Sequence, residues 1–220
     1  MMELLEFARG PVLTFALTVF IGGTLFRIAS LAFLWRTRDS SQGSARDKNA
    51  FLAATHEIVR RMWPLNPYKQ RTLFTLINGF VFHIGLAIIV FFLLPHILFI
   101  KDLTGLSWWN LPNNVIYAIS IITMVSLIAA LVMRWSNPAQ RIISTFDDWF
   151  SWLVTFLPVL TGVIASSHLG ARYETLLAIH ILSVALLLIY IPFGKLMHYF
   201  LVFVTRSQTG AHLNHRGAQL

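Results

Sequence analysis

The sequence predicts an all-α membrane protein, a polytopic bundle of five transmembrane helices, and three observations carry this prediction. Hydrophobic residues make up 56% of the chain and charged residues 12%, whereas about 25% of an ordinary soluble domain is charged. Five apolar stretches are long enough to cross a bilayer. The 17 Lys and Arg against 9 Asp and Glu indicate charge that flanks membrane spans, and they do not indicate a nucleic-acid-binding surface.

The positions of the five spans follow from the thickness of the bilayer. A core of about 30 Å needs roughly 20 apolar residues per helix, because lipid offers the backbone no hydrogen-bonding partner. The predicted spans cover residues 11–35, 73–100, 114–133, 149–167 and 175–196. The acidic start and the lack of a small-residue cleavage site predict that the first span is retained. We therefore predict a transmembrane domain over residues 1–205 and a cytoplasmic tail over residues 206–220.

Lys and Arg in the short loops predict the orientation of the bundle. Cytoplasmic loops carry an excess of these residues. Eight of them lie between predicted spans one and two, namely Arg36, Arg38, Arg46, Lys48, Arg60, Arg61, Lys69 and Arg71. Further positive residues follow spans three and five, whereas the opposite ends of the spans carry few. We expect the N-terminus outside and the C-terminus inside the cell.

The first cytoplasmic loop contains a predicted amphipathic helix over residues 50–63. Its apolar positions share one face at helical spacing, and they are Phe51, Leu52, Thr55, Ile58, Val59 and Met62. The opposite face is polar and holds His56, Glu57, Arg60 and Arg61. Such a helix can lie in the membrane interface or dock a soluble partner subunit, and we expect the interfacial arrangement. Pro64 and Pro67 end it before span two.

Four histidines at membrane depth are the strongest chemical signal in the sequence. They are His83 and His96 in span two, and His180 and His198 in span five. Polar groups at this depth are costly and usually face a ligand or another helix. A single histidine can serve as a helix-to-helix hydrogen bond or as a ligand, but two pairs on two helices favour ligands.

Spacing and topology predict which histidines face each other. His180 and His198 are 18 residues apart, which is five whole turns and about 27 Å in a straight helix. Span two runs antiparallel to span five, so His83 meets His198 towards the cytoplasm and His96 meets His180 towards the outside. His96 lies 13 residues after His83, which turns it about 140° from the face of His83. Pro95 can correct this mismatch by kinking or rewinding the last turn.

Each pair of facing imidazoles predicts a haem iron with both axial positions filled, which favours electron transfer over oxygen chemistry. The chain has no Cys. A covalently attached haem at a C-x-x-C-H motif, thiolate zinc sites and iron–sulfur clusters held by this chain are therefore excluded. We predict two b haems, an inner one held by His83 and His198 and an outer one held by His96 and His180.

Three further residues have two interpretations each. Gly79 and Gly85 flank His83 and can give room to a macrocycle or allow close helix packing. Arg27 lies well inside span one, where an unpaired charge is costly. Its guanidinium can pair with a haem propionate or snorkel to the cytoplasmic interface.

Short motifs around these histidines resemble one family of membrane cytochromes b. Span two carries Phe82-His83-Ile84-Gly85, and His180 is followed by Pro192-Phe193 and by Leu196-x-His198. Together with the length, span count and orientation, these motifs resemble the gamma subunit of respiratory nitrate reductase. The resemblance extends to related membrane cytochromes b of heterodisulfide-reductase-like, sulfite-reduction-associated and hydrogenase complexes.

The resemblance implies roles for some of these residues and departs from the family at one position. His83, His180 and His198 match ligand positions of the family. The second histidine of span two comes about a turn sooner in the nitrate reductase pattern, and Leu93 occupies that position here. His96 is therefore a displaced candidate ligand, which favours a relative of the nitrate enzyme over the enzyme itself.

The resemblance also implies an electron-transfer subunit of a quinone-linked oxidoreductase complex in a bacterial or archaeal cell membrane. It implies quinone chemistry near the outer haem and a cytoplasmic iron–sulfur partner at the inner haem. Two other functions compete with this one. A proton-coupled transporter or channel could use the histidines as a relay, although the sequence shows neither repeated halves nor matched interrupted helices. A haem-free membrane anchor would use them as hydrogen bonds between helices.

Overall fold

The computed structural model of the chain describes residues 2–33, 43, 49–63, 69–167 and 170–218, and within these residues it is helical without any strand. This finding confirms the predicted all-α class. The α-helices are α1 (Met2–Phe7), α2 (Leu13–Phe33), α3 (Ala50–Arg60), α4 (Lys69–Phe92), α5 (Leu94–Thr104), α6 (Asn113–Ser136), α7 (Pro138–Ile143), α8 (Phe146–Ser167), α9 (Tyr173–Tyr190) and α10 (His198–His215). A π-helical turn, η1 (Ala8–Val12), joins α1 to α2, and a 3-10 turn, η3 (Lys195–Met197), precedes α10.

Five helical segments of the described chain are long and apolar enough to cross a membrane, as predicted. They are Glu3–Leu31, Thr72–Phe92, Asn113–Ser136, Phe146–Ser167 and Tyr173–Tyr190. The first begins earlier than expected, because η1 accommodates Pro11 without ending the helix. The second and fifth end earlier than expected, and both ends are breaks close to a proline.

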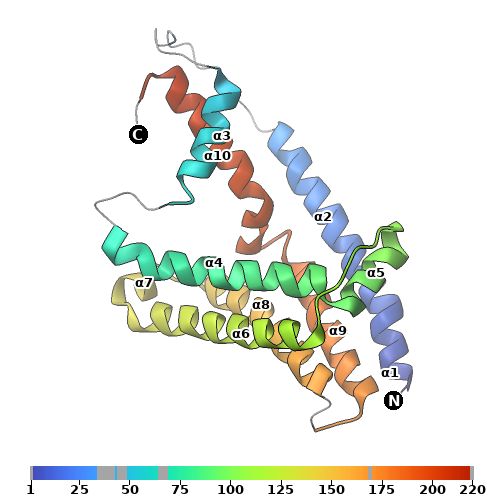
Figure 1. The fold of residues 1–220 in the computed structure, drawn as a ribbon. Helices are drawn as coiled ribbons and strands as arrows, with labels where there is room; N and C mark the ends of the chain where they lie inside the picture. The colour runs from blue at the N-terminus through green and yellow to red at the C-terminus, as the bar shows by residue number, and fades with distance from the viewer. Residues whose placement is uncertain (1, 34–42, 44–48, 64–68, 168–169, 219–220) are drawn as a thin grey trace.

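The spans form a chain of packed neighbours (Figure 1). Helix α4 packs on α6, α6 on α8, α8 on α9, and α9 on α2. Close approach of α4 and α6 requires Gly85, because a Cβ there would lie 2.0 Å from Thr123 Oγ1. The Asn78 amide and the Ser126 hydroxyl bond across the same interface. In the described part of the chain, α4 does not pack closely on α9 or α10. Helices α6 and α8 connect α4 to α9 in this series of contacts.

The predicted second span is interrupted at Leu93, which is extended (φ −82°, ψ 126°) and separates α4 from α5. Pro95 lies in the first turn of α5 and has no N–H to donate to a preceding carbonyl. The loop after α5 supplies other donors: the Trp108 indole donates to Phe91 O and the Leu111 amide to Phe92 O. Pro95 was expected to kink or rewind the helix, and the structure has a complete break.

The prediction that one straight helix carries both His180 and His198 is wrong, and His198 lies outside the candidate span Tyr173–Tyr190. Helix α9 ends at Tyr190, and Pro192, Gly194 and η3 separate it from α10. Proline cannot donate the backbone bond that would continue the helix. The Tyr190 ring occupies the space beside Gly194, where a Cβ would lie 2.2 Å from Tyr190 Cζ. His198 is therefore the first residue of a new helix.

Helices α3 and α10 pack along each other and project from one side of the bundle (Figure 1). A Cβ at Gly210 would lie 2.6 Å from Ala53 O and 2.7 Å from Glu57 Cβ, so the two backbones approach closely. The boundary predicted between residues 205 and 206 falls inside α10. Pro64 and Pro67, expected to end the helix before span two, lie outside the described residues.

The side of α3 that packs on α10 carries small and polar residues, including Ala53 and Glu57. Glu57 was expected on an exposed polar face, but its side chain is buried and bonds Arg60 and Arg61. The expected apolar face is largely exposed, with Phe51 at 71% and Val59 at 66%. Helix α3 therefore has a free apolar face and a buried carboxylate.

Candidate functional site

Two histidine pairs connect elements that are far apart in the sequence. His83 lies within α4 and His198 begins α10, and their ring centroids are 6.0 Å apart. His96 is the third residue of α5 and His180 lies within α9, and their centroids are 6.2 Å apart. These are the two pairs that the antiparallel arrangement of spans two and five predicts. We call them the His83–His198 pair and the His96–His180 pair.

The two separations fit imidazoles that bind one metal from opposite sides. A metal–imidazole nitrogen bond is about 2 Å long and the ring centre lies about 1 Å further out, which places two such centroids about 6 Å apart. The ring planes make angles of 83° in the His83–His198 pair and 14° in the His96–His180 pair. The angle between the ring planes is independent of the centroid separation, so both pairs could hold one metal between them.

Three of the four Nδ1 atoms face backbone carbonyl oxygens. His83 Nδ1 lies 2.7 Å from Gly79 O, His96 Nδ1 lies 3.0 Å from Ile89 O, and His198 Nδ1 lies 2.9 Å from Lys195 O. A carbonyl oxygen can only accept, so each of these Nδ1 atoms carries the hydrogen. With the hydrogen on Nδ1, Nε2 is the ring nitrogen that could bind a metal.

His180 reaches the same form through a hydroxyl network. Its Nδ1 lies 3.2 Å from Thr161 Oγ1, which is also 2.8 Å from Leu157 O and 2.9 Å from Ser183 Oγ. The Ser183 hydroxyl donates to His180 O. The Thr161 hydroxyl donates its one hydrogen to the carbonyl of Leu157, with Pro158 O at 3.3 Å as a weaker acceptor. Thr161 Oγ1 then accepts from His180 Nδ1.

The break before α5 explains how His96 comes to face His180. His96 Nδ1 contacts the carbonyl of Ile89, seven residues earlier, whereas seven residues of continuous helix would separate them by about 10 Å along the axis. The contact exists only because the chain turns at Leu93. The same turn removes the mismatch of about 140° that a straight helix would impose.

The two glycines near His83 have different surroundings. A Cβ at Gly79 would have no neighbour within 4 Å, whereas Gly85 is packed against Thr123. Open space thus exists beside Gly79, and Gly85 serves helix packing. A third glycine, Gly162, lies directly beside the other pair, where a Cβ would be 3.1 Å from His180 Cε1.

Arg27 lies exposed on α2 and forms no ion pair with another described residue. One turn earlier, the Thr24 hydroxyl lies 3.3 Å from the Tyr199 hydroxyl, next to His198. Arg27 therefore follows, at helical spacing, a residue that contacts the start of α10. Among the described residues, no carboxylate pairs with the guanidinium, so none of them would compete with an external anion.

Sequence reasoning did not identify the residues that orient the four rings. The acceptors are one hydroxyl, from Thr161, and three backbone carbonyls, and a carbonyl carries no residue-type signal. Thr161 lies 19 residues before His180 and on another helix. Its sequence neighbours Pro158 and Gly162 are the only signal that this part of α8 is unusual. His168 lies outside the described residues, and His56, His212 and His215 belong to α3 and α10.

Comparison with known proteins finds a similar curated protein but no family model. No family model and no solved structure matches the chain. A curated protein of Nitratidesulfovibrio vulgaris (strain Hildenborough), whose name is simply "Protein", is 31% identical over 212 residues. The match covers 93% of this chain and 91% of the relative. The chain therefore belongs to the same family as this Nitratidesulfovibrio vulgaris protein.

Proposed function

We propose that the chain is a dihaem cytochrome b, an electron-transfer subunit of a membrane redox complex. The observation that carries the proposal is the two facing histidine pairs, with ring centroids 6.0 and 6.2 Å apart, in which every Nδ1 lies within hydrogen-bond distance of an oxygen atom. His83 and His198 would hold one b haem, and His96 and His180 the other. When bound, each haem would supply reversible one-electron transfer.

The residues of the chain supply the binding and orientation of these groups. The carbonyls of Gly79, Ile89 and Lys195 and the Thr161 hydroxyl hold the imidazoles in the Nδ1–H form, which also strengthens them as ligands. The open space beside Gly79 suits a macrocycle. The free guanidinium of Arg27 would bind a propionate, with snorkelling as the alternative.

The proposed path of electrons runs between a membrane quinone and a cytoplasmic iron–sulfur partner. It rests on the resemblance to the nitrate reductase gamma family and on the membrane-spanning character of the bundle. The proposed orientation has the N-terminus outside a bacterial or archaeal cell membrane, as the excess of Lys and Arg between the first two spans suggests. The exposed apolar face of α3, with Phe51 and Val59, supports a helix that lies in the cytoplasmic interface.

A reduced-minus-oxidised absorbance spectrum of the purified chain tests the proposal. After expression in a haem-replete host, we expect the bands of low-spin haem b and two haems per chain. His198→Ala should remove one haem and His180→Ala the other. His56→Ala is the matched control, because His56 is exposed on α3 and should leave both haems. A chain purified without haem would overturn the proposal in favour of a haem-free anchor or a transporter.

A further inference from the structure

An ion-pair cluster lies beside the break between α9 and α10. Asp148 Oδ2 accepts hydrogen bonds from Lys195 Nζ at 2.5 Å and from Thr145 N at 2.9 Å, and Asp148 Oδ1 lies 3.1 Å from Arg134 Nη1. Only 12% of the Asp148 side chain is exposed. The carboxylate thus connects the C-terminal end of α6, the N-terminal end of α8 and the three-residue turn η3.

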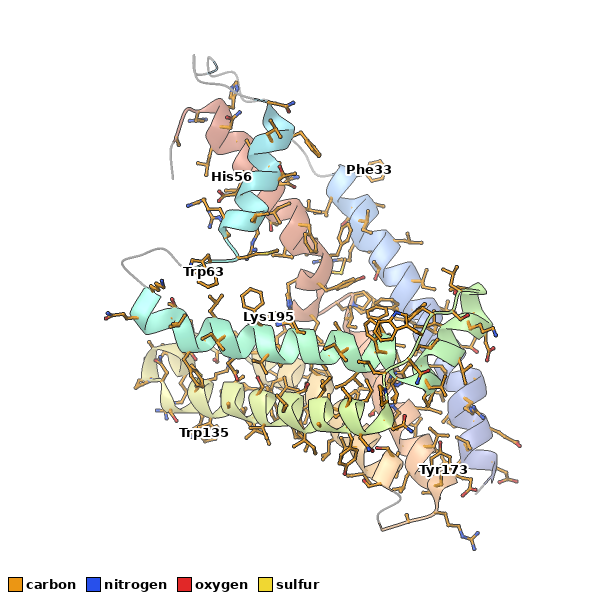
Figure 2. All side chains as sticks on the ribbon, viewed as in Figure 1. Phe33, His56, Trp63, Trp135, Tyr173 and Lys195 are labelled. Atoms are coloured by element: carbon orange, nitrogen blue, oxygen red, sulfur yellow. The ribbon has the colours of Figure 1, made fainter. Side chains whose placement is uncertain are left out.

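Lys195 belongs both to this cluster and to the environment of His198. Its side chain bonds Asp148, and its carbonyl accepts the hydrogen bond from His198 Nδ1 at 2.9 Å. Figure 2 shows Lys195 at the foot of α10, where the chain leaves the bundle. The turn η3 has only three residues and cannot hold its carbonyls as rigidly as a long helix does.

We propose that Asp148 and Lys195 are positioning residues for His198: their ion pair fixes η3, and η3 fixes the carbonyl that orients the imidazole. His83 needs no such device, because its acceptor, Gly79 O, lies four residues earlier in the same regular helix. The effect of this ion pair on the reduction potential of a bound haem rests on the proposed function. Its effect on the orientation of the His198 ring does not depend on haem.

The proposal predicts the sign of a change in reduction potential. A firm Nδ1–H···O bond makes an imidazole a stronger donor, which stabilises the oxidised iron. Loosening this bond by Asp148→Asn or Lys195→Met should therefore raise the midpoint potential of the haem held by His198. A purely electrostatic effect would give opposite signs, since Asp148→Asn removes a negative charge and Lys195→Met removes a positive one. Lys195→Met is thus the deciding variant.

The experiment is a potentiometric titration of the full chain in nanodiscs, followed optically and by the low-spin haem signals in electron paramagnetic resonance. We expect Lys195→Met and Asp148→Asn to raise one midpoint potential and alter one signal, while the other haem stays unchanged and reports an intact fold. Lys195→Arg keeps the positive charge, so the midpoint potential and the paramagnetic signal should both stay at their wild-type values. Glu174→Gln is the control for the loss of one negative charge, because Glu174 is exposed in the first turn of α9, at the opposite end of that helix from η3. A lowered potential in Lys195→Met, or no change, would overturn the proposal.

A second measurement keeps the inference separate from the proposed function. Nitrogen-15 spectra of histidine-labelled chain report which ring nitrogen of His198 carries the hydrogen, with or without haem. In the haem-free chain we expect the Nδ1–H form, and a gain of the Nε2–H form in Lys195→Met. If the wild-type chain binds no haem but this tautomer shift occurs, the proposed function fails and the positioning role stands. An unchanged His198 signal would contradict the positioning role.

Discussion

The His83–His198 pair and the His96–His180 pair have nearly equal ring separations, 6.0 and 6.2 Å, but the protein holds them differently. Both rings of the first pair are exposed, and their Nδ1 acceptors lie three or four residues away. Both rings of the second pair are half-buried, and their acceptors lie seven and 19 residues away. The Nδ1 acceptors of the first pair thus come from the local backbone, and those of the second come from across a helix break and from a neighbouring helix.

This difference implies that the two pairs respond to different substitutions. Changes at the α4–α5 break or in the α8–α9 interface should reach the His96–His180 pair alone. Changes in η3 or its ion pair should reach the His83–His198 pair alone. The response of each pair can be measured by the haem content and by the spectrum of each haem. The pair that a substitution does not reach serves as the internal control.

The largest effect is expected from Pro95→Ala. The substitution supplies a backbone N–H and permits α4 and α5 to join, which would carry His96 away from Ile89 O and from His180. We expect loss of one of two haems per chain, measured by haem extraction and absorbance. Pro11→Ala, in the π-helical turn η1, is the control and should retain both. Two unchanged haems in Pro95→Ala would show that the break does not place His96.

The next effect is expected at Gly162, which faces the His180 ring. A Cβ there would already lie 3.1 Å from His180 Cε1, so Gly162→Leu should displace the imidazole and lower the haem content of the His96–His180 pair. Gly22→Leu is the control, because a Cβ at Gly22 would have no neighbour within 4 Å. Equal haem content in both variants would exclude a packing role for Gly162.

A smaller effect is expected from Thr161→Val. Valine has a similar shape but no hydroxyl, so His180 Nδ1–H loses its acceptor, at a cost of about 1–3 kcal/mol. We expect both haems to remain and one midpoint potential to rise. Thr161→Ser should restore the potential, since serine keeps the hydroxyl. A shift of both potentials together would mean that the change spreads beyond the His96–His180 pair.

The smallest effect on the pairs is expected from Glu57, which lies far from both in the sequence. Hydrogen bonds from Arg60, together with Arg61, hold the pKa of this buried carboxyl below its ordinary value of 4.5. A lowered pKa stabilises the folded state above the ordinary pKa, and this stabilisation is lost as the pH falls through the folded value. Amide exchange in α3 should therefore accelerate below about pH 4.5 with both haem spectra unchanged. Glu57→Gln should remove this pH dependence.

Much of the fold could be predicted from the sequence, because a membrane span leaves a strong one-dimensional signal. Each long apolar stretch became a helix, since its backbone groups can bond only within a helix in lipid. The ends were less predictable. Pro95 was recognised as a point of distortion, whereas Pro192 was placed inside a straight helix. A proline marks where a helix can break, but the flanking contacts, such as the Tyr190 ring beside Gly194, decide whether it does.

The candidate site, like the fold, was only partly predictable from the sequence. The sequence by itself determined the four paired histidines, the exclusion of cysteine chemistry and the antiparallel order that pairs His83 with His198. It placed all four at membrane depth, whereas in the structure only His83 and His180 lie within candidate spans and His96 and His198 lie beyond the ends of theirs. Only the tertiary structure decided the Nδ1 acceptors, the roles of Thr161 and Gly162, and the link from Asp148 through Lys195 to His198. The physical reason is that helical periodicity locates side chains along one straight element. Hydrogen bonds from broken helices and neighbouring spans depend on how those elements pack.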